Sequence, residues 1–495
     1  MRFFASSLAT VVVFSAAARS CDGFLQKGTP SRAFLQTKSH GRSTTPLANS
    51  HFSVDSSHIG PAEGVVHTLT INSLPGQRAN DTEPIVIETG KIGRQAAGSV
   101  TLTRGDTVLY ATASRDEEPR AGLDFLPLSV EYQERFSSAG MTSGGYNKRD
   151  GRPAEHEVLT CRLIDRPLRP LIADGWRHET QLLSWVLSYD GARSCDPLAI
   201  VASATALYLS DIPLTKAVAA AMVGYDQEAD EFLLNPTHEE MAASQLQLIV
   251  AGTKDAVLMI EGAADFLPEE TMVRAVKFGH EAIRHICEAV EELGEVAGKE
   301  KNFDTLIRPP AGLQERVDEL MTEKVDEMYA LGGTKTTQGP VMKALKKELV
   351  DVLQEENEEY TSNDIGNAFK DLLCRRMFER AKTTGKRCDG RDLDEIRRLD
   401  METGFLPRVH GSALFTRGET QTMATATLGD SGMRQKIDKL DGTEEKRFYL
   451  QYTFPPSCVG ETGRVGAPGR REIGHGSKSG IVFLKGICVS STLIR

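Results

Sequence analysis

The sequence lacks paired cysteines. Its eight cysteines are spread singly over 495 residues, which fits neither a disulfide framework nor a zinc site, so we expect reduced thiols. No metal-ligand cluster, Ser/His/Asp set or pair of carboxylates with a telling spacing stands out either. The apolar run at 8–18 is too short to cross a bilayer. What remains is an ordinary globular composition, 40% hydrophobic and 26% charged, in a chain long enough for about three domains.

Positive charge is also in deficit. The formal net charge of −11 argues against a surface that binds nucleic acid everywhere. More than half of the excess lies in 311–360, which holds 12 acidic and 6 basic residues. A local nucleic-acid site therefore remains possible in the Arg-rich stretches outside this segment.

Residues 1–72 are predicted to be a targeting presequence and disordered leader. Arg2 precedes the apolar run, and Ala16 and Ala18 offer a signal-peptide cleavage site. From 23 to 54 the chain has no acidic residue, and its basic residues lie among many Ser and Thr, as in a transit peptide. Together the two parts resemble the bipartite presequences of plastids, with the mitochondrion as the alternative destination. An ordinary secretory signal with a disordered tail is the other interpretation, and the unpaired cysteines count against it.

An internal repeat organises the rest of the chain. The first copy contains Glu88-Thr89-Gly90, Gly98-Ser99 and Thr103-Arg104-Gly105, and the second contains Glu402-Thr403-Gly404, Gly411-Ser412 and Thr416-Arg417-Gly418. The second and third pieces are equally spaced in both copies, and the one-residue difference before them suits a loop. We predict two copies of one fold, each opened by this hairpin. Arg104 and Arg417 are interpreted as hairpin residues paired with Asp106 and Glu419.

Apolar periodicity and turn signals place the elements and the domain boundaries. Strands are expected at 66–71, 84–87, 99–102, 108–113, 217–224, 245–250 and 256–260. Helices are expected from Pro153 to a stop or kink at Pro167, and at 197–209, 269–293, 313–331, 341–356 and 365–381, with interruptions at Gly332-Gly333 and Gly339-Pro340. The resulting domains are the first core (73–211 and 212–300), an all-helical linker (301–386), an incomplete second core (387–476) and an aberrant tail (477–495).

The densest candidate site is the segment 460–476. Its glycines let the backbone approach an anion, Arg470 and Arg471 offer planar donor forks, and His475 lies between two glycines. This pattern suits phosphate oxygens, although the segment is no Walker loop. A flexible surface loop with solvated arginines is the alternative. From pattern alone, the sequence indicates a duplicated α+β protein with anion sites and no particular reaction.

The first copy holds a basic stretch at the matching place, which favours the anion-binding interpretation. Its basic residues are Lys148, Arg149 and Arg152, and Tyr146 precedes them. The Tyr146 ring could stack on a base, or it could simply be packed.

Two long motifs resemble a known family. The run from Phe405 to Thr420, Gly460-Glu461-Thr462-Gly463 and the run from Gly469 to Gly476 are similar to the second RNase PH-like core of bacterial and organellar polynucleotide phosphorylases. The stretches 149–153 and 163–171 resemble the first core. The resemblance implies an α+β fold with two RNase PH-like cores, built of ribosomal protein S5 domain 2-like βαβα units and joined by a small all-α domain.

The function that this resemblance implies is phosphorolytic 3′-to-5′ exoribonuclease activity in organellar RNA decay and 3′-end processing. Inorganic phosphate attacks the terminal phosphodiester of single-stranded RNA and releases nucleoside diphosphates, with Mg²⁺ or Mn²⁺ as cofactor and a homotrimeric ring as the assembly. Tyr146, Lys148, Arg149 and Arg152 match the RNA-facing loop of the ring. Arg470, Arg471 and His475 match active-site residues near phosphate and RNA. Asn147 stands where the family often has a second aromatic, so a full stacking constriction is not expected.

The end of the sequence departs from the family pattern. The family's Ser-rich phosphate-binding turn, its metal-binding aspartates and its KH and S1-type domains follow the motif that ends at Gly476, and 477–495 does not continue it. We therefore expect that this chain alone does not catalyse phosphorolysis. A non-catalytic RNA-binding or ring-scaffolding subunit is the alternative function, and a metabolic nucleotide-binding protein is a third.

Overall fold

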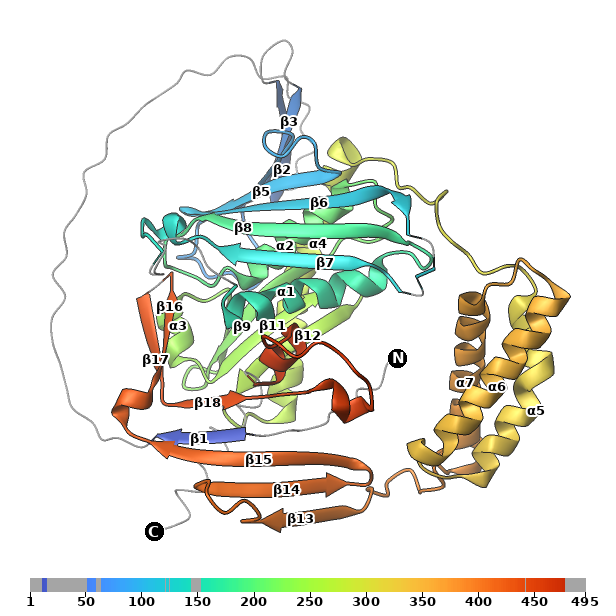
Figure 1. The fold of residues 1–495 in the computed structure, drawn as a ribbon. Coiled ribbons are helices and arrows are strands. Elements are labelled where there is room, and N and C mark those ends of the chain that lie inside the picture. The colour runs from blue at the N-terminus through green and yellow to red at the C-terminus, as the bar shows by residue number, and fades with distance from the viewer. Residues whose placement is uncertain are drawn as a thin grey trace.

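The first core is built on a large twisted sheet. The computed structural model describes the backbone of 11–15 and residues 51–58, 64–120, 122–123, 125–143, 153–440 and 442–476. The large sheet has the strand order β2-β3-β4-β5-β6-β8-β7, in which only β7 and β8 run parallel (Figure 1). Its strands are β2 (Phe52–His58), β3 (Val65–Ile71), β4 (Ile85–Thr89), β5 (Gly98–Arg104), β6 (Thr107–Pro119), β7 (Leu128–Glu134) and β8 (His178–Ser188).

A second sheet and four helices complete the first core. This sheet is antiparallel, with the order β10 (Glu231–Leu234), β9 (Ala219–Asp226), β11 (Leu246–Gly252) and β12 (Val257–Ala264). The helices are α1 (Glu155–Leu168), α2 (Asp196–Leu209), α3 (His238–Ala243) and α4 (Glu269–Ala297), with short 3₁₀ turns η1 (Phe136–Ala139) and η2 (Arg169–Leu171). Because α2 is apolar all round, it is buried where it contacts both sheets.

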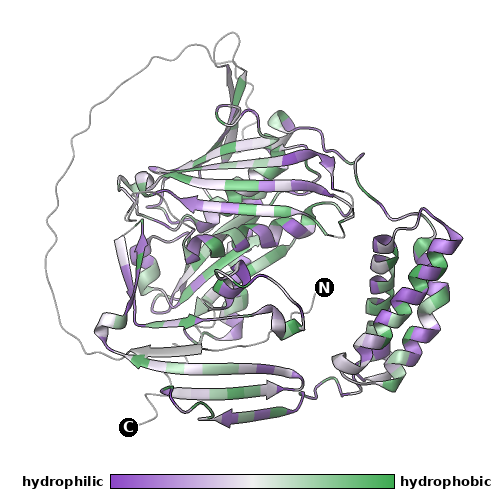
Figure 2. Ribbon diagram, viewed as in Figure 1, coloured by the Kyte–Doolittle hydropathy of each residue, from purple (hydrophilic) through white to green (hydrophobic). Residues whose placement is uncertain are grey.

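The helical linker domain stands apart from the sheets in Figure 1. Its helices are α5 (Leu313–Leu331), α6 (Lys335–Glu356) and α7 (Ser362–Thr384), and they share a separate apolar core. Hydrophobic and hydrophilic residues alternate along them in Figure 2, as expected for helices with one buried stripe. The predicted interruption at Gly332-Gly333 is confirmed, because both glycines adopt positive φ and end α5.

The predicted break at Gly339-Pro340 is wrong, because α6 runs through it. Pro340 lies in the second turn of α6, so it removes one backbone hydrogen bond near a helix end. Gln338 also ties that turn to the Cys388 carbonyl over 2.9 Å. The predicted stop at Pro167 is confirmed to within one residue, because α1 ends at Leu168 and the 3₁₀ turn η2 follows.

The second copy repeats the opening meander of the first. Its strands are β13 (Leu399–Thr403), β14 (Gly411–Arg417) and β15 (Thr420–Gly429), followed by η3 (Ser431–Met433), β16 (Gln435–Lys439), β17 (Gly442–Lys446), β18 (Phe448–Gln451) and η4 (Pro456–Val459). Glu88 pairs with Thr101 and Glu402 with Leu414, each the third residue after the Gly of the Gly-Ser pair. The register is thus identical, and the one-residue difference lies in the loop, which confirms the predicted duplication.

Two findings change the predicted leader. β2 pairs with β3, and β3 pairs with β4, so the first sheet begins at Phe52 rather than at residue 73. The composition of 1–72 suggested a leader without a fold, but backbone hydrogen bonds add two of its segments to the sheet. The short strand β1 (Val11–Ser15), part of the predicted signal-peptide core, lies between β15 and β18.

The remaining sequence predictions about side chains are settled in part. All six cysteines within the described ranges are free thiols, as expected. The predicted pairing of Arg104 with Asp106 is wrong, since Arg104 bonds to Asp81. Within the described residues, no helix combines the length and hydropathy that a membrane span requires.

Candidate functional site

The three predicted active-site residues of the second copy lie on one helical turn, 470–476. Arg471 and His475 are four residues apart, so they share a face of the turn. Each is placed against an aromatic ring from the end of β18: the Arg471 guanidinium lies 4.2 Å from the centre of the Phe454 ring, and the His475 and Tyr452 rings are 4.9 Å apart. The structure therefore brings a cation and an imidazole together on an aromatic support.

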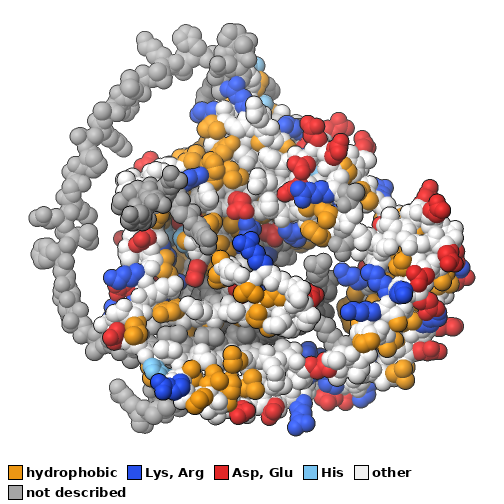
Figure 3. Space-filling view, viewed as in Figure 1, with side chains coloured by type: hydrophobic (Ala, Val, Ile, Leu, Met, Phe, Trp, Pro, Cys, Tyr) orange, Lys and Arg blue, Asp and Glu red, His pale blue; other side chains and the backbone are white. Residues whose placement is uncertain are grey.

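Arg470 points instead to the first core. Its Nη1 donates to the Val130 carbonyl over 2.9 Å, and its Nη2 forms a 2.6 Å ion pair with Glu131, both on β7. Leu440, also from the second copy, is buried in the first core's apolar cluster. Arg470 thus joins the two copies, and Figure 3 shows Lys and Arg side chains gathered at this junction.

A capping glutamate orients the helical turn. Glu472 accepts from the backbone N–H of Gly469, which starts the turn, and from that of Phe454. In the first core Glu157 accepts in the same way from Ala154, at the start of α1, and from Glu134, at the end of β7. Each helix is thereby fixed to the strand that precedes it, as in a capping box.

These caps align the two copies residue by residue. With Glu157 matched to Glu472, the positions of Arg470, Arg471 and His475 are held in the first core by Glu155, His156 and Thr160. Where the second copy has two arginines, the first core has a glutamate and a histidine. The first core therefore does not offer the same cationic turn.

The counterpart residues in the first core form a polar cluster. His156 Nε2 lies 2.9 Å from Glu134, and although burial opposes it, this carboxylate raises the pKa of His156. Thr160 donates to Asp196 over 2.7 Å, and burial raises the pKa of Asp196. The cluster is internally satisfied rather than open to a phosphate group.

Arg162 and Arg166 are four residues apart, so sequence spacing alone predicts that they share one face of α1. In the structure the Arg162 guanidinium packs on Gly474, where an added Cβ would come within 3.3 Å of Cζ. The glycine thus permits α1 to approach the helical turn 470–476. Spacing along α1 predicted the shared face, but nothing in the sequence indicated the partner.

The predicted RNA-binding residues Tyr146, Lys148, Arg149 and Arg152 lie outside the described residues, so their interactions stay a prediction. The described chain resumes at Pro153, just before α1. No group of three or more His, Cys, Asp or Glu in the described ranges is arranged to hold a metal ion. These residues do not fit a divalent cation, and we assign no step to one.

Comparison with known proteins agrees with the duplicated fold. The family model described as "3' exoribonuclease family, domain 1" matches twice, at 81–213 and 395–489, and that of domain 2 matches at 216–282. Together these matches cover more than half of the chain. The predicted α+β fold with two RNase PH-type cores and a helical segment between them is confirmed, the second core being partial.

The curated proteins that this chain resembles are polyribonucleotide nucleotidyltransferases. A probable polyribonucleotide nucleotidyltransferase 1, chloroplastic, of Oryza sativa is 45% identical over 79% of this chain and 49% of its own length. The polyribonucleotide nucleotidyltransferases of Protochlamydia amoebophila and Bradyrhizobium diazoefficiens are 46% and 47% identical, over 56% and 54% of their lengths. The chain thus spans about half the length of these relatives. It belongs to the RNase PH-type 3′ exoribonuclease family and is a homologue of the polyribonucleotide nucleotidyltransferases.

Proposed function

We propose that the chain serves phosphorolytic 3′-to-5′ degradation of single-stranded RNA. In that reaction an oxygen of inorganic phosphate attacks the phosphorus of the last phosphodiester, and the bond from phosphorus to the preceding 3′ oxygen breaks. The terminal nucleotide leaves as a nucleoside diphosphate, and the 3′ oxygen takes up a proton. The observation that carries the proposal is the placement of Arg471 and His475 on one turn at the junction of the two cores.

The chemistry needs cations because phosphate and the RNA backbone repel each other. Arg471 offers a planar fork of donors that suits phosphate oxygens, and its stacking on Phe454 fixes the plane of that fork. His475 is the side chain on this turn able to supply a proton to the departing 3′ oxygen near neutral pH. We assign Arg470 to positioning, because its hydrogen bonds to Val130 and Glu131 hold the turn against β7.

The wider setting of the reaction rests on resemblance. We propose Lys148, Arg149 and Arg152, with Tyr146, as the RNA-facing loop of a homotrimer, and Mg²⁺ or Mn²⁺ as the cofactor of the assembled enzyme. A plastid role in RNA decay and 3′-end processing is supported by the chloroplastic rice relative, with the mitochondrion as the alternative.

A phosphorolysis assay tests the proposal. Purified protein is given poly(A), phosphate and Mg²⁺ or Mn²⁺, and ADP release is measured. Release by the unchanged chain would overturn the expectation that it is inactive alone, and its rate is then the reference for the variants. Arg471→Gln should lower the rate about 100-fold, the scale of losing one charge-stabilising donor. Arg464→Gln, an exposed arginine of the same segment, is the matched control and should change it little. Equal effects of both changes, or ADP release that does not need phosphate, would contradict the assignment.

One observation favours one other function, a non-catalytic RNA-binding or scaffolding subunit. Arg470 already bonds to the first core. The same preparations separate the two functions. RNA binding without any ADP release, at all metal and phosphate concentrations, supports the subunit.

A further inference from the structure

A large cavity lies beside α1, lined mostly by the first core and closed by Lys439 and Leu440 of the second copy. Its volume is about 910 Å³, and residues of α1, β11, β12, β16 and the start of α2 line it. This volume lies within the range of small-molecule sites and is far more than a phosphate ion fills. A ligand with both a charged and an apolar part would suit it.

Most of the charged groups that line the cavity are already paired. Arg166 bonds to Glu261 over 2.6 Å and His156 to Glu134 over 2.9 Å. Lys439 pairs with Glu444, and Asp196 accepts from Thr160 and Ser194. The remaining histidine of the wall, His238, lies 2.9 Å from the Tyr189 hydroxyl.

Arg162 is the exception. Among the residues that the structure describes, no carboxylate forms an ion pair with Arg162, and its Nε is buried without a hydrogen-bond acceptor. Burial lowers the pKa of its guanidinium, and the neighbouring charge of Arg166 lowers it further. The carboxylates of Glu261 and Asp165 offset part of this effect without an ion pair, and a ligand anion in direct contact would offset more of it.

The opposite part of the cavity is apolar and ends in an exposed ring. Met222, Met241 and Ile249 form wall positions, and Phe266 stands at the rim with 73% of its surface exposed. Phe266 also has a φ of 54°, which is strained for a residue with a ring, and such strain often marks functional positions. An exposed ring beside a cavity is a platform on which a nucleobase can stack.

We propose that this cavity is a binding site for a nucleoside phosphate, with the phosphate on Arg162 and the base against Phe266. No residue of the helical turn 470–476 lines the cavity, so the site is separate from Arg471. Arg162 touches both places, through the cavity on one side and Gly474 on the other. The proposal concerns binding alone and does not rest on the proposed reaction.

Calorimetric titration with ADP tests the site. The titrations use the Arg471→Gln protein, so that any product site on the helical turn contributes little to the heat. Two further substitutions are each made in this background. Arg162→Gln should weaken ADP binding about tenfold, because the charged contact is lost. Phe266→Asn should weaken it about fivefold, because stacking is lost. Asparagine tolerates positive φ, so the second change removes the ring without adding strain.

Controls separate binding from folding. Arg284→Gln on α4, whose exposed side chain pairs with Glu281, should leave ADP affinity unchanged. Arg162→Lys should restore part of the affinity lost in Arg162→Gln, and all variants should show the parent's circular dichroism spectrum. Inorganic phosphate alone should bind more weakly than ADP and should not respond to Phe266→Asn.

Three results would overturn the proposal. The first is no ADP binding at millimolar concentration, and the second is affinity that neither Arg162→Gln nor Phe266→Asn changes. The third is equal loss in Arg284→Gln. ADP binding that depends on Arg162 would leave this site standing whether or not the phosphorolysis assay detects ADP release.

Discussion

Arg104 and Asp81 form an ion pair of 2.6 Å in which only 5% and 6% of the two side chains are exposed. Asp81 uses its second oxygen to accept from Arg193 over 3.1 Å, and Arg193 also pairs with Glu83. Burial lowers the pKa of the Arg104 guanidinium, against the raising effect of Asp81. The residue just before the turn of the repeated hairpin is therefore anchored to the segment that precedes β4, and not to the hairpin itself.

Asp81→Asn should destabilise the protein by about 3 kcal/mol, because it leaves the buried charge of Arg104 without its partner. Urea unfolding followed by tryptophan fluorescence measures the change, since Trp176 and Trp185 both lie in the first core. The matched control is Asp255→Asn, which breaks the exposed pair with Lys216 and should cost far less, because solvent screens an exposed pair. Equal losses from both changes would show that burial does not govern this pair.

The sequence predicted the local elements well, because strands and helices follow from residue order and periodicity. The repeated hairpin, the apolar helix α2 and the three helices of the linker are examples. Partners that lie far apart along the chain could not be predicted from the sequence. Arg470 bonds to Glu131, which is 339 positions away.

The two capping glutamates also have partners that the sequence does not indicate. Glu157 and Glu472 lie in short motifs that suggest helix starts, but the strand-end N–H groups that they also bind are 23 and 18 residues away. At Pro340 the error was the reverse, because a local signal predicted a break that the structure does not have. A strong local breaking signal was overridden near a helix end, where a proline costs few hydrogen bonds.

Glu157→Ala should destabilise the first core by about 2 kcal/mol. The change removes the acceptor for two backbone N–H groups, those of Glu134 and Ala154, at a side chain that is buried. Glu155→Ala is the control in the same first turn, where an exposed acid contributes about 0.5 kcal/mol through the helix dipole. Chemical denaturation measures the free energy of unfolding of both variants. A larger loss of this free energy in Glu155→Ala would contradict the capping role of Glu157.

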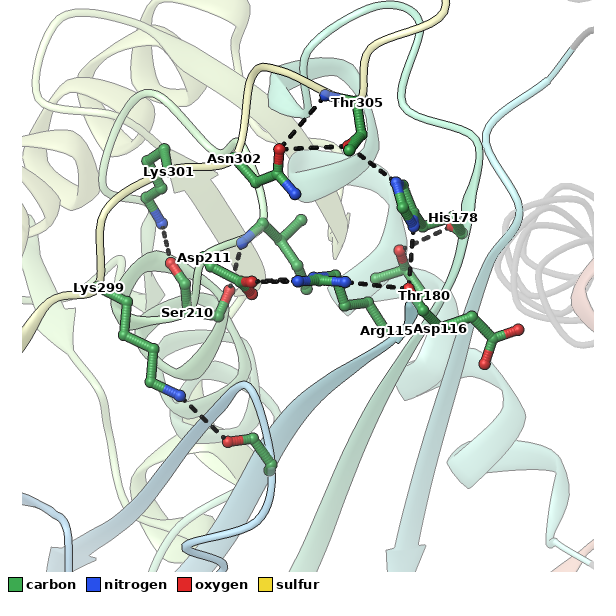
Figure 4. A network of polar contacts seen from close by, with 12 residues as sticks. Arg115, Asp116, His178, Thr180, Ser210, Asp211, Lys299, Lys301, Asn302 and Thr305 are labelled. Atoms are coloured by element: carbon green, nitrogen blue, oxygen red, sulfur yellow. Dashed lines mark hydrogen bonds and ion pairs between the residues drawn. The ribbon is translucent and has the colours of Figure 1, made fainter. Parts of the chain in front are cut away.

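The segment that leads to the helical domain is fastened by Lys301 (Figure 4). Its Nζ donates to the carbonyls of Tyr208 and Ser210, each over 2.6 Å, at the end of α2. Burial lowers the pKa of Lys301 to about 8, so the cost of desolvation offsets part of this bonding. Beside it, Asn302 and Thr305 connect the same segment to Asp211 and His178.

Lys301→Met should therefore cost only about 1 kcal/mol in global stability but should loosen this segment locally. Hydrogen exchange of the amides in 299–307 should become faster, with little change in α5 to α7. Lys299→Met is the control, since Lys299 is exposed and reaches one carbonyl at 3.5 Å. Unchanged exchange in Lys301→Met, or equal acceleration in the control, would contradict the role given to Lys301.

The last prediction concerns pH and the pair of His156 with Glu134. Although burial opposes both charges, the pair raises the pKa of His156 above 6.5 and lowers that of Glu134 below 4.5. The contribution of His156 is therefore complete below pH 6.5 and is lost as pH rises through its folded pKa, whereas that of Glu134 is lost as pH falls below 4.5. The pair should contribute most between these two values.

His156→Gln should therefore cost about 1 kcal/mol near pH 5.5 and roughly half of that or less at pH 8, as measured by urea unfolding at both values. His67→Gln provides a control of opposite sign. Burial lowers the pKa of His67, so its protonation disfavours the folded state, and removing it should help more at pH 5.5 than at pH 8. If His156→Gln showed the pH dependence expected for His67→Gln, the ion pair would not be what holds α1 to the end of β7 on this side of the cavity.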